Sequence, residues 1–117
     1  MKNVKGEVAQ KLLTVSENVS DAYPADWSKD HVIQYMEEDN KVHTRTDNTE
    51  QLAYIRYRID IWHNKSTSEI AMQVDEAISS LGLVRTMCQD VADHTMKHKV
   101  MRYEGIIDME SGIVYWE

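Results

Sequence analysis

The sequence predicts an α+β fold in which two helices pack on one mainly antiparallel sheet. Three observations lead to this prediction. Apolar residues recur at helical spacing in residues 2–17 and again in residues 68–81, and they alternate with polar residues in residues 51–63. The expected order of elements is helix, strand, strand, helix and then three strands, which is typical of the α+β class.

Each predicted helix has one apolar stripe. In the first helix the stripe consists of Val4, Val8, Leu12 and Val15. In the second helix it consists of Ile70, Ala71, Val74, Ala77, Ile78 and Leu81. Residues 66–68 offer side-chain oxygens that suit an N-cap, and Gly82 follows the second stripe where a left-handed C-cap is expected. We therefore expect two amphipathic helices that each bury one face.

Five segments have the composition of strands. They are residues 31–37, 51–63, 83–88, 96–108 and 113–116. The segment 51–63 is the clearest, because one apolar residue follows each polar residue along its length. It exceeds the five or six residues that are usual for a strand, so we expect part of it to project beyond the core as an arm.

Polar stretches separate these elements. The expected connections are residues 18–30, 41–49 and 90–95. The acidic run of residues 37–40 is expected to end the first strand in a solvated turn. Long polar loops seldom serve only as connections, so we expect residues 41–49, or the segment 23–27, to form a partner-facing surface.

Length and charge limit the classes of function. A chain of 117 residues with 42% hydrophobic and 28% charged residues suits one core, and we expect residues 1–117 to form a single domain. The net charge of -7 argues against general binding to nucleic acid or to an anionic membrane. Cys88 is the single cysteine, which favours a reducing compartment. No signal-like or membrane-spanning apolar run is present, so we expect a protein made in the cytoplasm.

The sequence contains no pattern that indicates catalysis. The four glycines lie too far apart for a phosphate-binding loop, and no Gly-x-Ser-x-Gly elbow is present. Carboxylates are numerous, but acid–base chemistry needs a pair held in one pocket. Asp60 shares a polar strand face with Arg56 and Arg58 and is better explained by a cross-strand salt bridge. We therefore expect no enzyme activity and no cofactor.

The strongest metal-binding candidate in the sequence is the set Cys88, His94 and His98, with Asp93 nearby. Two histidines four residues apart share a face on a helix, but this segment is predicted to run from a loop into a strand. Four residues then span about 13 Å, too far for a local chelate. We therefore predict no metal site here, and we expect Cys88 to be a small buried apolar residue.

Basic residues concentrate on two predicted strands. Arg56 and Arg58 share one strand face, and a second group follows later in the chain: Lys97, His98, Lys99 and Arg102. If the two strands are neighbours, an otherwise acidic protein gains one positive patch. Such a patch suits docking onto an acidic partner, including another copy of the chain, or facing DNA. The alternative is a solvated sheet face on which Glu and Asp neutralise each cation.

The second half of the chain resembles the tail-terminator, or tail-completion, family of long-tailed phages. The resemblance depends on the strand YRIDIW at residues 57–62, on the helix 68–81 with its ending LGLVR, and on the stretch HKVMRYEGIID at residues 98–108. It covers residues 51–117. Residues 1–50 match only in pattern, as a helix followed by a strand.

The resemblance implies a structural protein without catalysis or cofactor. Members of the family form a ring, usually a hexamer, that caps the growing tail tube, stops its polymerisation and presents a surface to the head or neck. The implied partners are further copies of the chain, the tail tube protein, the neck or head connector protein and the tail sheath protein. Neither sequence-specific nucleic acid nor a membrane is among them. The implied location is a virion or a phage-like tail particle, assembled in the bacterial cytoplasm.

Six residues are candidate contacts with other subunits or partners: Arg56, Arg58, Trp62, Lys97, Lys99 and Arg102. Other functions remain open at this point. The chain could be another head–tail connector or neck protein, since these also have small α/β folds. It could also be a small cytoplasmic binding module that holds a ligand against its open sheet face, or a metal-dependent hydrolase.

Overall fold

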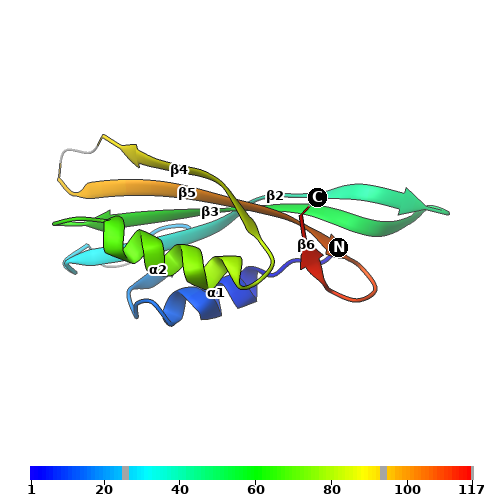
Figure 1. Ribbon diagram of the computed structural model, residues 1–117, viewed down its shortest axis with the longest axis horizontal. Coiled ribbons are helices and arrows are strands. Elements are labelled where there is room, and N and C mark those ends of the chain that lie inside the picture. The colour runs from blue at the N-terminus through cyan, green and yellow to red at the C-terminus, as the bar shows by residue number, and fades with distance from the viewer. Residues whose placement is uncertain (25–26, 93–94, 117) are drawn as a thin grey trace.

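A computed structural model describes residues 1–24, 27–92 and 95–116 and confirms the α+β class. In this part of the chain two helices cover one face of a six-stranded, mainly antiparallel sheet (Figure 1). The elements are α1 (Lys5–Leu13), β1 (Val19–Asp21), β2 (His31–Thr46), β3 (Thr49–His63), α2 (Ser68–Ser79), β4 (Val84–Val91), β5 (Lys97–Asp108) and β6 (Val114–Tyr115). Neither described helix has the length and apolar character that crossing a membrane requires.

The strands lie in the order β1-β2-β3-β5-β4, and β6 pairs with β5. All pairs are antiparallel except β1 with β2. The prediction missed β1, which lies within the expected connection of residues 18–30. This three-residue strand forms because the backbone after α1 pairs with β2 in the register Val19↔Ile33, while the Val19 side chain packs against the core.

The core lies between the helices and the inward face of the sheet. On β3, five side chains are fully buried at alternate positions: Ala53, Ile55, Tyr57, Ile59 and Ile61. The helices contribute Val8 and Leu12 from α1 and Ala71, Val74 and Ile78 from α2. These helix residues belong to the two predicted stripes, so the predicted faces are confirmed.

Two buried tyrosines hold the helical layer against the sheet. The hydroxyl of Tyr57 accepts a hydrogen bond of 2.9 Å from the backbone N–H of Val4 and donates to Glu37 at 3.2 Å. The hydroxyl of Tyr103 donates to Asp75 of α2 at 2.7 Å. Burial raises the pKa of both phenols well above the usual value of 10.0, so both remain protonated donors.

The predicted end of the first strand and the predicted loop 41–49 are wrong. Instead, β2 continues through the acidic run to Thr46, and β3 begins at Thr49. The turn between them contains only Asp47 and Asn48, with φ of 52° and 62°. Two central residues of positive φ are typical of a type I′ hairpin turn, and Asp and Asn tolerate this conformation.

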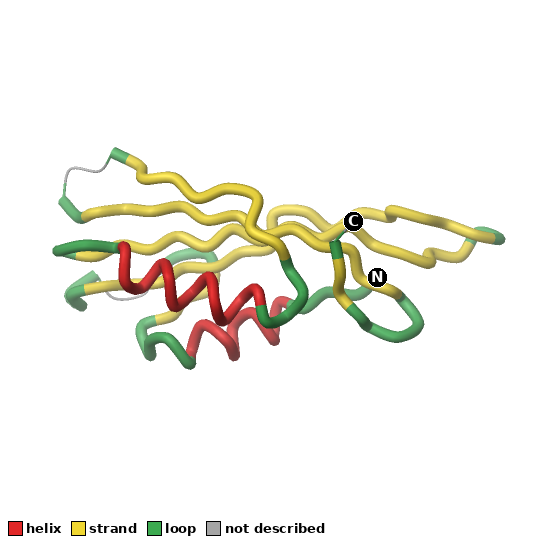
Figure 2. The backbone as a smooth tube through the Cα atoms, viewed as in Figure 1, coloured by secondary structure: helices red, strands yellow, loops and turns green. Residues whose placement is uncertain are grey.

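The distal part of this hairpin projects from the rest of the molecule (Figures 1 and 2). We call residues 41–51 the hairpin arm. Pairing between β3 and β5 ends at Leu52↔Asp108, so beyond this point β3 pairs only with β2. The molecule measures 52 × 22 × 21 Å as a result. The sequence predicted an arm formed by part of residues 51–63. The arm instead consists of residues 41–51, and its first strand belongs to β2.

Candidate functional site

The face of the sheet that the helices leave uncovered, here called the outer face, carries four of the six predicted contact residues. On β3, Arg56, Arg58 and Trp62 alternate with the buried core residues. Arg102 of β5 is the register partner of Arg58 and therefore lies on the same face.

The other two predicted contact residues lie on the opposite, helix-covered side. Lys97 pairs with His63, and Lys99 pairs with Ile61, whose side chain is part of the core. The Lys99 ammonium lies 2.8 Å from a carboxylate oxygen of Asp90, and this hydrogen bond raises the pKa of the Lys99 ammonium. Strands β3 and β5 are neighbours, but the pleat divides the cations between two faces, so one positive patch does not form.

A buried carboxylate organises one end of the outer face. Asp60 is only 2% exposed although no helix covers it. It accepts two hydrogen bonds from the Arg58 guanidinium, at 2.7 and 2.9 Å, and lies 2.7 Å from Nε2 of His98. The bond to Asp60 raises the pKa of the Arg58 guanidinium. Asp60 therefore forms an ion pair as predicted, but with Arg58 of its own strand rather than with a cation of a neighbouring strand, and its cross-strand contact is to His98.

Two tryptophan rings pack next to His98, the histidine that contacts Asp60. The Trp62 ring stacks on the His98 ring at 4.3 Å between centroids, and the Trp27 ring meets Trp62 edge-on at 5.2 Å. Trp27 itself is 54% exposed. This cluster of Trp27, Trp62 and His98 therefore presents aromatic surface to solvent next to the Asp60 carboxylate. It lies on the outer face at the end remote from the hairpin arm.

The acidic run of residues 37–40 supplies counter-charge in the middle of the outer face. Glu38 accepts hydrogen bonds from the Arg102 guanidinium at 2.8 and 3.3 Å. Its carboxylate also lies 3.3 Å from Nε of Arg56. Three of the predicted cations are thus paired with Glu38 or Asp60. This arrangement matches the neutralised sheet face that the sequence left as an alternative.

Near the hairpin arm the outer face becomes aromatic again. The hydroxyl of Tyr54 bonds to Glu104, the ammonium of Lys41 lies 4.8 Å from the Tyr54 ring centroid, and the Trp116 ring lies 6.3 Å from it. Burial alone would raise the pKa of Glu104, but hydrogen bonds from Thr86 and Tyr54 outweigh it and lower that pKa.

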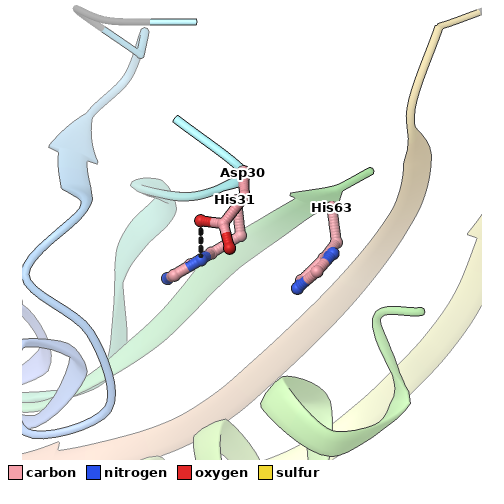
Figure 3. A group of neighbouring side chains, drawn as sticks. All are labelled: Asp30, His31 and His63. Atoms are coloured by element: carbon pink, nitrogen blue, oxygen red, sulfur yellow. Dashed lines mark hydrogen bonds and ion pairs between the residues drawn. The ribbon is translucent and has the colours of Figure 1, made fainter. Parts of the chain in front are cut away.

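A histidine cluster lies at the end of the sheet opposite the hairpin arm. We use this name for Asp30, His31 and His63 (Figure 3). His31 begins β2, His63 ends β3, and the two are register partners whose rings stack at 5.6 Å. Nδ1 of His31 lies 2.8 Å from Oδ1 of Asp30, and this bond lowers the pKa of the Asp30 carboxyl. The cluster could not be predicted from the sequence, because the two histidines lie 32 positions apart and only the strand register joins them.

Ser16 extends the histidine cluster toward the end of α1. Its hydroxyl oxygen lies 2.7 Å from Nε2 of His31 and accepts a bond from the backbone N–H of Asn18 at 3.0 Å. Ser16, His31 and Asp30 are thus linked by hydrogen bonds in the same way as the serine, histidine and carboxylate of a hydrolase triad. Here, however, Asp30 is 65% exposed, whereas the carboxylate of a triad is buried. The contacts of Ser16 connect the segment after α1 to the start of β2.

The metal-binding candidate from the sequence does not come together in the described structure. Cys88 pairs with Met101, which faces the core, whereas His98 pairs with Trp62 on the outer face. The two side chains therefore lie on opposite sides of the sheet. Cys88 is exposed rather than buried as expected. The remaining members, Asp93 and His94, lie outside the described residues.

Comparison with models of known protein families finds no match to this chain, and a search of curated protein sequences finds none either. The fold and its surfaces define an α+β protein with a projecting hairpin arm, a charge-paired outer face and a histidine cluster at the far end.

Proposed function

We propose that this chain is a structural assembly protein that forms a ring capping a phage or phage-like tail tube. The ring ends tube polymerisation and joins the tail to the neck or head. The resemblance of residues 51–117 to tail terminators led to this hypothesis, and the hairpin arm is the observation that supports it most strongly.

The hairpin arm has the character of a segment that contacts another molecule. Every residue from position 41 to 49 is exposed, so the arm buries little of its own surface. An exposed two-stranded ribbon is marginal in water unless something packs on it. An arm of this kind reaches past the helix-covered body and suits insertion between or over neighbouring subunits of a ring.

The sheet also offers unpaired edges. Within the described residues, β4 pairs with β5 along one side and has no strand on its other side. On β2, partner strand β1 covers only residues 33–35, and among the described residues no other strand pairs with this edge, although its register shifts make it a weaker template than β4. Free edges carry unpaired backbone donors and acceptors, which are templates for pairing with another chain. They add to the surface available for assembly.

The first test is native mass spectrometry of the purified chain over a concentration series, with negative-stain imaging of any large species. The proposal expects a closed ring, usually of six copies, alone or when tail tube protein is supplied. A chain that stays monomeric in both conditions, and leaves tube growth unchanged, contradicts the proposal. Binding to a neck protein without ring formation would instead favour another head–tail connector.

The second test shortens the hairpin arm in register. Deleting residues 45–46 and 49–51 places the Asp47–Asn48 turn directly between the register partners Thr44 and Leu52. We expect the monomer to fold and the ring to be lost. The matched control is Asn48→Gly, which keeps the arm length and suits the positive φ of 62° at this position. Equal assembly by both variants would remove the arm from the interface.

A change of charge tests the predicted contact residues more cleanly at Arg56 than at Arg58. Arg58 bonds to the buried Asp60, so Arg58→Glu would disturb folding as well as any interface. The Arg56 side chain is 36% exposed and pairs with Glu38 at a longer distance. Because Arg56→Glu would set a carboxylate beside Glu38 and directly opposite Glu104, like-charge repulsion would lower stability, and Arg56→Gln is the cleaner variant. We expect Arg56→Gln to weaken assembly while thermal unfolding stays close to that of the unmodified chain.

A further inference from the structure

We propose that Asp30, His31 and His63 form a binding site for a transition-metal ion of the zinc type. This inference does not depend on ring formation. Nothing in the sequence pattern pointed to these three residues as a set. His31 and His63 come from the two strands of the β2–β3 hairpin at the end remote from the arm, and Asp30 immediately precedes β2 (Figures 1 and 3).

The donor set fits the chemistry of such an ion. Zinc prefers imidazole nitrogen and carboxylate oxygen, and neutral imidazole also suits copper and nickel. Two imidazoles and one carboxylate leave a further coordination position for water or for a group from another molecule. Calcium and magnesium, which prefer oxygen donors alone, are disfavoured by this set.

The strand register provides the geometry. His31 and His63 lie directly opposite each other on antiparallel strands, where Cβ atoms are about 5 Å apart. One ligand atom from each of the three residues lies within 4.8 Å of the others. In a tetrahedral zinc site with bonds of about 2.0–2.1 Å, neighbouring donors are about 3.3 Å apart. Side-chain rotation can close this difference, because all three side chains end at the sheet margin.

The hydrogen bonds around His31 leave it suitable as a ligand. When Nδ1 of His31 binds the ion, Nε2 carries the proton and can donate to the Ser16 hydroxyl, 2.7 Å away. A ligating histidine that donates its other N–H to a fixed acceptor is typical of metal sites, because the second bond sets the tautomer and the ring orientation.

When the ion binds, His63 and Asp30 each lose one hydrogen bond and gain a bond to the ion. Nδ1 of His63 accepts a hydrogen bond of 2.9 Å from the backbone N–H of Lys65, so the ion either replaces this bond or shifts the ring proton. Asp30 exchanges its bond to His31 for a bond to the ion. The Lys65 amide and the Asp30 side chain are both exposed, so water can satisfy the groups that are released.

The test is calorimetric titration of the full chain with Zn²⁺, supported by Co²⁺ absorption spectra, which report tetrahedral nitrogen and oxygen ligation. We expect saturable binding of one ion per chain, and shifts of the His31 and His63 imidazole resonances when Zn²⁺ is added. His63→Ala and Asp30→Ala should each weaken binding by about tenfold or more. His63→Gln, which keeps a polar side chain, provides a second variant if the alanine variant folds poorly.

Two control variants remove other possible ligands. His43 lies on the hairpin arm and Cys88 on β4, so His43→Ala and Cys88→Ser should bind Zn²⁺ as the unmodified chain does. The proposal is overturned if no one-to-one binding occurs. It is also overturned if a folded His63 variant binds with full affinity, or if Cys88→Ser abolishes binding. All of these titrations use the free chain, so their outcome is independent of whether the chain forms a ring.

Discussion

Asp60 is the residue whose environment is least expected from its type. Its carboxylate is buried on a sheet face without helices, pairs with the Arg58 guanidinium and lies 2.7 Å from Nε2 of the His98 ring. The His98 ring in turn stacks on the Trp62 ring. A buried charge without its partners is strongly destabilising, so the three groups depend on one another.

Replacing Asp60 by alanine should therefore lower the free energy of unfolding by about 2–4 kcal/mol. The matched control is Asp90→Ala. Asp90 also pairs with a cation, Lys99, but its side chain is 79% exposed, and such pairs contribute little. We expect the control to change stability by no more than about 0.5 kcal/mol. Urea unfolding followed by circular dichroism measures both, and equal effects would show that the Asp60 pair is not buried in solution.

Glu104 makes the stability of the fold depend on pH in the acidic range. Its pKa in the folded chain lies below the usual 4.5, so the folded state binds its proton less readily than the unfolded chain. Its contribution is present above pH 4.5 and is lost as the pH falls through the lower, folded-state pKa. Glu104→Gln should therefore flatten the loss of stability below this pH. Thermal unfolding at stepped pH measures the slope, and Glu110→Gln in the exposed turn is the control; matching slopes for both variants would contradict the prediction.

At the scale of elements, the end of α2 depends on the close approach of two backbones. Gly82 has φ of +90°, and an added Cβ would lie 2.4 Å from the carbonyl oxygen of Val114 in β6. Only glycine allows this contact, which brings the last strand against the turn that follows α2. The approach therefore links the helical layer to the C-terminal hairpin.

Gly82→Ala should destabilise the chain by about 2 kcal/mol or more, since it adds both strain and overlap. Gly6→Ala is the informative control. Gly6 lies in α1 with no atom within 4 Å of an added Cβ, so alanine there should stabilise by about 0.5–1 kcal/mol. Opposite signs in chemical unfolding would confirm the contrast; a neutral Gly82→Ala would mean that β6 moves away freely.

The elements that the sequence predicted are those with one buried face. The stripes of α1 and α2 and the alternation in β3 all arise because one side of each element meets the core. The strand predicted at residues 83–88 is confirmed as β4, but residues 41–46 of β2 and 90–91 of β4 were expected in connections. These residues are exposed, so burial leaves no pattern in their composition. These residues form a strand because they pair with a neighbouring strand, and the spacing of apolar residues in the sequence does not indicate such pairing.

Residues of the candidate sites could be grouped correctly from the sequence only where they lie on the same strand. The alternation in β3 correctly grouped Arg56, Arg58 and Trp62 on one face. The grouping of Lys97 and Lys99 with Arg102 failed, because it ignored the pleat within β5. The histidine cluster and the role of Glu38 needed the register between β2, β3 and β5, and a single sequence does not contain that information.

At the scale of the whole molecule, the structure has a compact body and an extended end. The helices cover only part of the 52 Å length, and the arm lies beyond the contact between β3 and β5. Local opening is easiest where few buried contacts must break. The molecule should therefore show very different stability along its long axis.

Amide hydrogen exchange of the free chain should reveal this gradient. We expect the slowest exchange in the buried part of β3, residues 55–61, and fast exchange in residues 42–51 of the arm. In an assembled ring, the arm amides should become protected while the β3 core changes little. Uniform protection along β3 in the free chain would contradict the gradient, and an unprotected arm in the ring would place the interface elsewhere.

The irregular register of β2 has a consequence for the protein before any partner is met. Shifts occur between Glu37 and Asp39, between Val42 and Thr44, and between Thr44 and Arg45. Each such bulge increases the local twist of the ribbon, and a twisted edge that also carries Lys41 and Arg45 is a poor template for stacking into fibrils. The bulges that distort this long hairpin therefore protect a newly synthesised chain from aggregation. This protection matters while the exposed edge of β2 is not yet bound to another subunit.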